Sequence, residues 1–312
     1  LAMPGMIFKA LRWMLKRDAP LYVSPKPDLE RLGWLLAFAR RCNWHDFTRI
    51  ADARAAILQR SRRLIGELVQ SEALDCEFAE QGTLYVYRDP RALAADERHF
   101  ESLQRLGIEV ERKSADAVQA MEPALLPGVA GGFQHPGDAR LRPDRYVAEL
   151  ARRVRELGGV VEENTGVDRF KTESGQIRQV SAGGRQFTGE RVVLALGAWS
   201  PLLAKSLELR LPMQPGKGYS LTWSRPQLCP RMPLVLHEAS VCVTAWDSGF
   251  RLGSTMEFSG YDTRLNQVRL DALKRGAARY LHQPQGPQLL EQWWGWRPMT
   301  VDELPIIGPS AR

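Results

Sequence analysis

The sequence lacks several features that would place it in a specialised class of protein. Its longest uninterrupted apolar run, Leu32 to Ala39, is far shorter than the roughly 20 residues of a membrane-spanning helix. The four cysteines form no CxxC pair, which argues against a disulfide framework or a zinc site and indicates a reducing compartment. The five histidines show no HExxH or similar spacing, so we predict no metal site. The absence of fixed repeats and low-complexity runs argues against a solenoid or a disordered chain.

Acidic residues are too few to balance the basic ones. The chain has 43 Lys and Arg against 36 Asp and Glu, a net charge of +7. Such an excess suits nucleic acid, an anionic membrane surface or acidic substrates, but also an ordinary arginine-rich surface. The arginines are scattered, and no helix-turn-helix, zinc-finger or aromatic nucleic-acid motif accompanies them. We therefore expect no nucleic-acid partner.

The two ends of the chain carry separate signals. Residues Met6 to Lys16 have the pattern of a basic amphipathic helix, which could lie on a membrane surface or pack on its own protein. No signal peptide is recognisable, so we expect a cytoplasmic protein, and peripheral contact with the inner membrane face stays open. The chain begins without Met and stops just after the apolar stretch Leu304 to Gly308. We therefore expect a fragment.

Hydrophobic periodicity predicts a mixed α/β chain. Apolar residues at helical spacing predict helices over 29–42, 49–70, 90–106, 115–121, 144–157 and 265–282. Alternating or β-branched stretches predict strands over 81–87, 108–112, 131–134, 218–223, 234–237, 241–246, 250–256 and 293–297. Between these groups we expect a strand over 160–164, a three-stranded meander over 167–172, 177–181 and 185–188, and a buried parallel strand over 191–196.

The predicted strand over 191–196 ends in a glycine. In open α/β sheets, ligands bind beyond the carboxyl ends of the strands, and a glycine there lets the backbone approach a cofactor closely. Ala195, Gly197 and Ala198 could therefore lie against a dinucleotide. A plain strand-to-loop glycine is the alternative.

A longer motif carries a family resemblance. The stretch Gly295-Trp296-Arg297-Pro298-Met299-Thr300, with Asp302, Pro305 and Gly308, resembles the Gly-x-Arg-Pro-x-Thr-x-Asp-x-x-Pro-x-x-Gly pattern of the D-amino acid oxidase superfamily of FAD-dependent oxidoreductases. Further similarity lies in Gln81–Leu84, Met121–Leu125 and Ala195–Ser200. A narrower resemblance to the small subunit of bacterial D-amino acid dehydrogenases rests on Lys9–Met14, Ala19–Leu21 and Lys217–Thr222.

This resemblance implies an α/β fold in two parts. One is an incomplete FAD-binding domain of the Rossmann type, glutathione-reductase-like, over 141–204 and 299–312. The other is an α+β substrate domain with a mainly antiparallel sheet over 71–140 and 205–298. Residues 1–70 would be a helical segment packed on both. The family's strand and G-x-G-x-x-G turn, whose helix holds the FAD pyrophosphate, are not in this sequence, nor is its Gly-rich stretch after Gly308.

The resemblance also implies roles for particular residues. Arg297 would hold the substrate carboxylate, and Tyr219 would shape the pocket or bind that carboxylate, unless it is an ordinary half-buried sheet tyrosine. The backbone of Val167 would contact the adenine of FAD. The other implied cofactor contacts are Ala195, Gly197, Ala198, Trp199 and Gly308. Cys242 stands where relatives of the glycine oxidase type would have Tyr.

The resulting expectation is FAD-dependent oxidative deamination of D-amino acids, of the D-alanine kind, by hydride transfer to the flavin. A 2-oxo acid and ammonia would be the products, and a quinone or other carrier would accept the electrons. Two alternatives stay open. One is a glycine- or sarcosine-type amine oxidase that uses O₂, and the other is an inactive fragment that cannot bind FAD alone.

Overall fold

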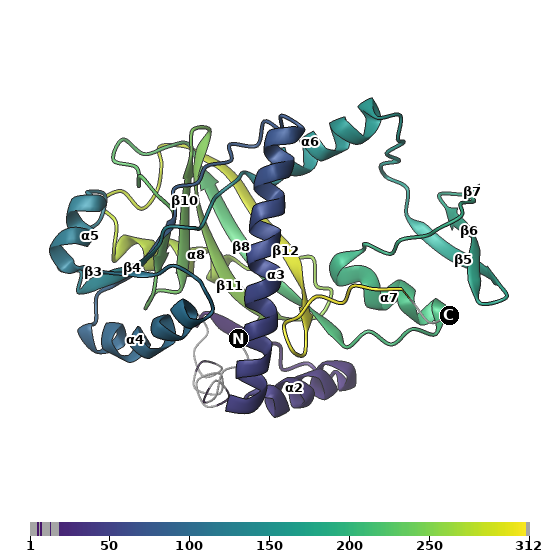
Figure 1. Ribbon diagram of the computed structural model, residues 1–312, viewed down its shortest axis with the longest axis horizontal. Coiled ribbons are helices and arrows are strands. Elements are labelled where there is room, and N and C mark those ends of the chain that lie inside the picture. The colour runs from purple at the N-terminus through teal and green to yellow at the C-terminus, as the bar shows by residue number, and fades with distance from the viewer. Residues whose placement is uncertain (1–4, 6, 8–12, 14–18, 310–312) are drawn as a thin grey trace.

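The computed structural model describes residues 5, 7, 13 and 19–309. The basic helix expected over Met6 to Lys16 therefore lies almost entirely outside the described residues. The molecule has two unequal parts (Figure 1). A large sheet with its helices occupies one side, and a thinner extension of helix α6, a small second sheet and helix α7 occupies the other.

The large sheet has nine strands and provides the framework of the molecule. Its order is β12-β8-β11-β10-β9-β2-β4-β3, and β1 pairs with β11 beside that path. All pairs are antiparallel except β1 with β11 and β2 with β9. The bounds are β1 Leu21–Val23, β2 Thr83–Tyr87, β3 Glu111–Ser114, β4 Gly131–His135, β8 Met213–Trp223, β9 Leu234–Leu236, β10 Val241–Trp246, β11 Gly249–Phe258 and β12 Leu289–Thr300.

Alternate residues of the strands face two different environments, because side chains in a strand point to opposite sides. On one face, Tyr219, Leu221 and Trp223 of β8 pack into the main core with helices α5 (Ala115–Met121) and α8 (Gln267–Ala278). On the other face, α4 (Pro90–Arg105) covers a smaller core that includes Phe100 and Phe133. We call this second side of the sheet the α4 face.

Two helices precede the large sheet. Helix α2 (Leu29–Arg41) begins where the Asp28 side chain accepts a hydrogen bond from the Arg31 N–H. The long helix α3 (Trp44–Ser71) begins at Asn43, whose side chain accepts from the Asp46 N–H. Such caps satisfy backbone donors that a helix start leaves unpaired. In Figure 1, α3 crosses in front of the large sheet.

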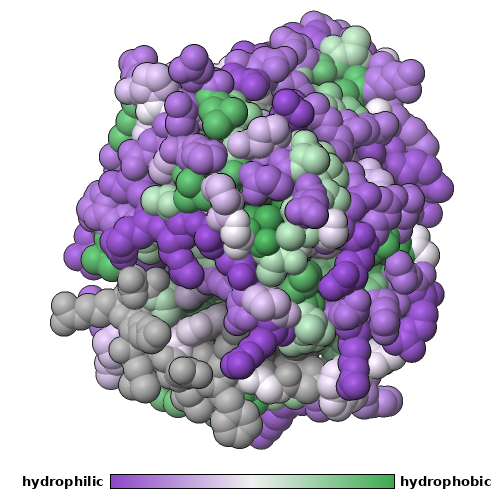
Figure 2. Space-filling view, turned by 90° about the vertical axis from the view of Figure 1, so that its left-hand side faces the viewer, coloured by the Kyte–Doolittle hydropathy of each residue, from purple (hydrophilic) through white to green (hydrophobic). Residues whose placement is uncertain are grey.

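Two observations concern the surface of the described residues. No described helix is long and apolar enough to cross a membrane. Figure 2 shows the end of the molecule that carries α4 and α5, where apolar residues form narrow groups between hydrophilic ones. In this view, the described residues form no broad apolar surface at this end.

The extension begins with α6 (Pro143–Glu156), which ends before Gly158, a residue with left-handed backbone (φ 85°). The predicted meander is confirmed as a separate three-stranded sheet. Its strands are β5 Val167–Glu173, β6 Gln176–Ala182 and β7 Arg185–Phe187. The short 3-10 helices η1 (Gly197–Trp199) and η2 (Lys205–Leu207) flank α7 (Ser200–Ala204).

Two predicted strands are wrong. Residues 160–164 and 191–196 have no regular secondary structure, and neither pairs with a strand in the described part of the chain. Val160 and Val193 are 79% and 84% exposed. A strand of apolar residues is stable only where neighbours satisfy its backbone and cover its side chains. The small second sheet lies between these segments in sequence but pairs with neither.

The fold class predicted from the sequence is confirmed, because the chain has a mixed α/β fold with a mainly antiparallel main sheet. The strands of that sheet come from both sides of the 141–204 segment in sequence. The 1–70 segment contributes β1 as well as its helices. The exact domain division stays a prediction.

Candidate functional site

Arg297 lies on the edge strand β12, opposite Gly216 of β8, and its side chain extends across the α4 face. Its Nη1 donates a hydrogen bond to the carbonyl oxygen of Thr255 at 3.1 Å. Arg297 therefore reaches over β8 to β11, and the carbonyl of β11 fixes the direction of the guanidinium.

A β-bulge in β11 makes that carbonyl available. The register between β11 and β8 shifts between Ser254 and Glu257. Ser254 and Thr255 have φ values of 120° and 69°, which are unusual for residues other than glycine. Such conformations cost about 1–3 kcal/mol each and cluster at functional sites. Here the strained segment turns a backbone oxygen toward Arg297.

Glycines on β8 make room for the guanidinium. A Cβ atom on Gly218 would lie 2.6 Å from Cζ of Arg297, well inside van der Waals contact. A Cβ on Gly216 would likewise lie 2.6 Å from Cγ of Met299. A glycine inside a strand often marks such a close approach. Gly218 thus leaves the space that the Arg297 guanidinium occupies beside β8.

The charge of Arg297 is not neutralised locally. Among the described residues, no carboxylate lies within ion-pair distance of its guanidinium, although Arg297 itself is exposed. Although the residue as a whole is exposed, protein atoms around the guanidinium displace part of its water and so lower its pKa; an arginine nevertheless stays charged. Burial also raises the pKa of the nearby Cys242 thiol, whereas the positive charge of Arg297 acts in the opposite direction. The site is therefore a cation beside a neutral thiol.

Tyr219 is not brought together with Arg297. It lies opposite Trp294 and Ser254, and its ring belongs to the main core on the other face of the sheet. The ammonium of Lys217 lies 5.3 Å from the centre of that ring. Burial raises the pKa of Tyr219, and the Glu257 charge adds to this. Tyr219 is therefore a neutral core residue in this structure.

The segment Gly197–Trp199 lies beside the Arg297 strand. The Trp199 and Trp296 rings are 5.2 Å apart and nearly perpendicular. Ala198 is buried, whereas Gly197 is exposed, with left-handed backbone (φ 53°) and open space where a Cβ would lie. Three predicted cofactor residues thus stand next to the predicted substrate arginine.

The other predicted cofactor residues are more distant from this group in the fold. Val167 begins β5 and pairs with Ala182 in the second sheet. Ala195 is exposed in the unpaired 191–196 segment. Gly308 is also exposed, with φ 156° and open space at its Cβ position. The structure gives these three residues no contact with Arg297.

The residues near Arg297 fit the ring side of a flavin. Gly197 leaves open space at its Cβ position, and Trp199 offers an exposed indole. The phosphates of FAD have no comparable site among the described residues, because no described helix begins at a G-x-G-x-x-G turn. The residues near Arg297 thus suit a flavin ring, and the guanidinium suits a carboxylate.

Two features of this site were not predicted from sequence. The role of the Thr255 carbonyl depends on backbone angles that the sequence does not reveal. Tyr261, whose hydroxyl donates to the carbonyl oxygen of Ala198 at 2.8 Å, carries no motif. Gly216 and Gly218, alternate glycines within one strand, were a signal that could have indicated a close approach.

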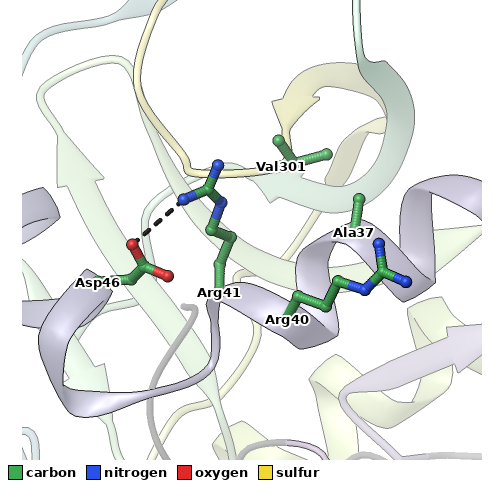
Figure 3. A pocket seen from close by; sticks show the side chains of 5 residues that line it. All are labelled: Ala37, Arg40, Arg41, Asp46 and Val301. Atoms are coloured by element: carbon green, nitrogen blue, oxygen red, sulfur yellow. Dashed lines mark hydrogen bonds and ion pairs between the residues drawn. The ribbon is translucent and has the colours of Figure 1, made fainter.

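Two clefts of the described surface are not lined by Arg297. Figure 3 shows one of about 370 Å³ lined by Ala37, Arg40, Arg41, Asp46 and Val301. In it, Arg41 is paired with Asp46 at 3.2 Å, while Arg40 points away from that pair. No described group of His, Cys, Asp and Glu could hold a metal ion. Neither observation competes with the Arg297 site.

The fold and this arginine site define a class of protein. A mainly antiparallel sheet that presents a charged arginine beside a glycine-containing loop is suited to binding an amino-acid carboxylate next to a flavin. The chain belongs to the DAO family of FAD-dependent oxidoreductases, whose family profile matches residues 24–312.

Individual relatives agree with this assignment. The D-amino acid dehydrogenase of Cereibacter sphaeroides is 30% identical over 312 residues, covering 98% of this chain and 72% of the relative. Glycine oxidase from Geobacillus kaustophilus has a similar fold, with a TM-score of 0.75, 23% identity and coverage of 81% of this chain and 69% of that one. L-proline dehydrogenase from P. horikoshii matches with a TM-score of 0.68 and 19% identity over 81% and 69% of the two chains.

Proposed function

We propose that the protein uses FAD to oxidise D-amino acids to 2-oxo acids and ammonia. One observation carries the proposal. Arg297 presents a guanidinium with one hydrogen bond to the Thr255 carbonyl and no carboxylate partner among the described residues. The similarity to the Cereibacter D-amino acid dehydrogenase supports the choice of substrate class.

The chain's own residues would bind and orient the substrate. Arg297 would hold the substrate carboxylate through two parallel N–H···O bonds, a geometry that guanidinium offers and ammonium does not. The Gly197–Trp199 loop and Gly308 would contact the flavin. Bound FAD would supply the electron-accepting chemistry by taking the hydride from the substrate α-carbon.

The test is a spectrum followed by a substrate challenge. The purified chain is incubated with FAD, desalted, and mixed anaerobically with D-alanine or L-alanine. Retained flavin absorbance that D-alanine bleaches and L-alanine does not is the expected result. Retained flavin that is indifferent to D-amino acids would refute the substrate class.

Arg297 variants test the carboxylate role. Arg297→Ala removes charge-assisted hydrogen bonds worth about 1.5–3 kcal/mol each. We expect kcat/KM for D-alanine to fall roughly 10²- to 10⁴-fold. Arg297→Lys keeps the charge but not the planar fork, and should recover only part of this loss. Equal activity of the Lys variant and the original chain would contradict bidentate binding.

A glycine- or sarcosine-type amine oxidase that reduces O₂ is a second candidate. The support for this candidate is the similarity of the fold to that of glycine oxidase. Cys242 beside Arg297 argues against it, because a glycine pocket of that type would have a tyrosine there. Comparing sarcosine with D-alanine, each with O₂ and with a quinone analogue, separates the two. Faster flavin reduction by sarcosine, with O₂ as the better oxidant, would favour this candidate.

A chain that cannot retain FAD is the third candidate. The unpaired segments 160–164 and 191–196 and the lack of a buried residue in α6 favour it. It predicts that desalting removes all flavin, while the Arg297 site still binds a carboxylate.

A membrane quinone as electron acceptor requires contact with the bilayer, and α2 is suited to this. Its exposed Leu29, Leu32 and Leu36 follow helical spacing and form one stripe. Exposed Lys26, Arg40 and Trp44 flank that stripe, as in helices that lie at an anionic interface. Co-sedimentation with anionic vesicles but not with neutral ones is expected. Equal sedimentation with both, or with neither, would contradict this contact.

A further inference from the structure

The Gly197–Trp199 loop is not held in place by the segment that precedes it. Residues 191–196 pair with no strand in the described chain, and Val193 in that segment is largely exposed. Ala198, in contrast, is almost completely buried. The position of the loop must therefore be fixed by what it contacts on the large sheet.

Two contacts fix it there. The Tyr261 hydroxyl donates to the Ala198 carbonyl oxygen at 2.8 Å. The Tyr261 ring also lies 5.3 Å from Trp296, at an interplanar angle of 77°, and the same Trp296 packs against Trp199. Trp296 precedes Arg297 in β12. One tyrosine thus contacts both the loop and the strand that carries the substrate arginine.

The segment around Tyr261 is itself tightly held. The Asp262 carboxylate accepts the Arg264 N–H at 2.9 Å, which closes a local turn. Lys217 of β8 is fully buried, and its ammonium donates a hydrogen bond to the Arg264 carbonyl oxygen. Asn266 donates to the Glu257 carboxylate at 3.1 Å. The segment that follows Tyr261 is therefore anchored to β8 and β11, and the chain leaves β11 at Phe258, three residues before the tyrosine.

We propose that Tyr261 is a positioning residue that sets the distance between the Gly197–Trp199 loop and Arg297. Burial raises the pKa of Tyr261, so its hydroxyl stays a donor at neutral pH. The inference rests on the proposed function only in taking this loop as a flavin contact. Loss of the hydroxyl should loosen the loop while leaving Arg297 in place.

The first readout needs neither flavin nor substrate. In Tyr261→Phe, which keeps the ring, hydrogen exchange of the segment 195–204 should accelerate about tenfold, the equivalent of ~1.4 kcal/mol and within the range of one buried hydrogen bond. Exchange in β8 and β11 should not change. The matched control is Tyr280→Phe, which removes another buried hydroxyl bond, to Glu238, away from this loop. Unchanged exchange in 195–204, or equal acceleration in the control, would overturn the proposal.

The second readout separates positioning from a merely structural role. In the FAD-loaded chain, Tyr261→Phe should lower kcat for the amino acid several-fold at nearly constant KM, because carboxylate binding by Arg297 is retained. A raised KM at constant kcat, or unchanged kinetics despite faster exchange, would overturn it. Since the exchange experiment contains no cofactor, failure of the proposed activity leaves that result interpretable.

Discussion

Substituting Gly218 by alanine should disable carboxylate binding without unfolding the protein. The added Cβ would lie 2.6 Å from Cζ of Arg297, whereas carbon atoms in contact are about 3.5–4.0 Å apart. The guanidinium must therefore move by about 1 Å or more, which breaks its 3.1 Å hydrogen bond to the Thr255 carbonyl.

The size of the effect follows from the bonds that the displaced guanidinium can still make. If it keeps only one of its two hydrogen bonds to the carboxylate, the loss is about 1.5–3 kcal/mol, which corresponds to a roughly 10- to 150-fold weaker site. The cost in stability should be smaller, because an arginine side chain at the surface can move. In addition, alanine in a strand is favoured over glycine by about 0.5–1 kcal/mol.

The assay is a titration of the chain with D-alanine, followed by the NMR shift of the Trp296 indole and by thermal unfolding in parallel. Gly253→Ala is the matched control. It lies on the neighbouring strand of the same face, and its added Cβ would meet its nearest atoms only at 3.8 and 3.9 Å. Equal binding by the two variants would refute the claim that Gly218 makes room for the arginine.

Two further predictions concern stability. Burial raises the pKa of Glu122 above its ordinary 4.5, although backbone N–H groups such as that of Arg231 donate to it. The stabilising contribution of Glu122 is therefore complete below pH 4.5 and is lost as the pH rises through its raised pKa. In urea unfolding, the original chain should lose stability relative to Glu122→Gln over that pH range. A difference in stability that is independent of pH would contradict this prediction. Thr255→Gly should relieve the left-handed backbone and change stability by less than about 1 kcal/mol, whereas Thr244→Gly, in ordinary strand geometry, should cost more by the same assay.

Local patterns predicted most elements of the fold. The helix over 115–121 and the strand over 241–246 have the predicted bounds, because caps and turns mark their ends in the sequence. Helix α3 begins five residues earlier than predicted, at Trp44, because Asn43 caps it. The failures at 160–164 and 191–196 have a different cause. Those segments have strand-like composition, but pairing depends on a neighbour, which no local pattern reveals.

The site was predictable to a similar extent. The Arg-Pro motif singled out Arg297, and the predicted strand end singled out Gly197 and Ala198, which the structure places close together. Tyr219 lies one position from Gly218 and therefore on the opposite face of β8. The sequence motif contains both Gly218 and Tyr219. Only the pairing register of the strand decides which of the two faces Arg297.

The bulge in β11 also makes the length of this strand critical. Two positions of β8 separate Tyr219 from Lys217, whereas three positions of β11 separate their partners Ser254 and Glu257. The additional residue keeps the Glu257 carboxylate on the buried side with Lys217. Deleting one residue here would turn that carboxylate outward to the side of Arg297, where it would compete with any substrate. Point substitutions in the bulge should therefore be tolerated far better than a single-residue insertion or deletion.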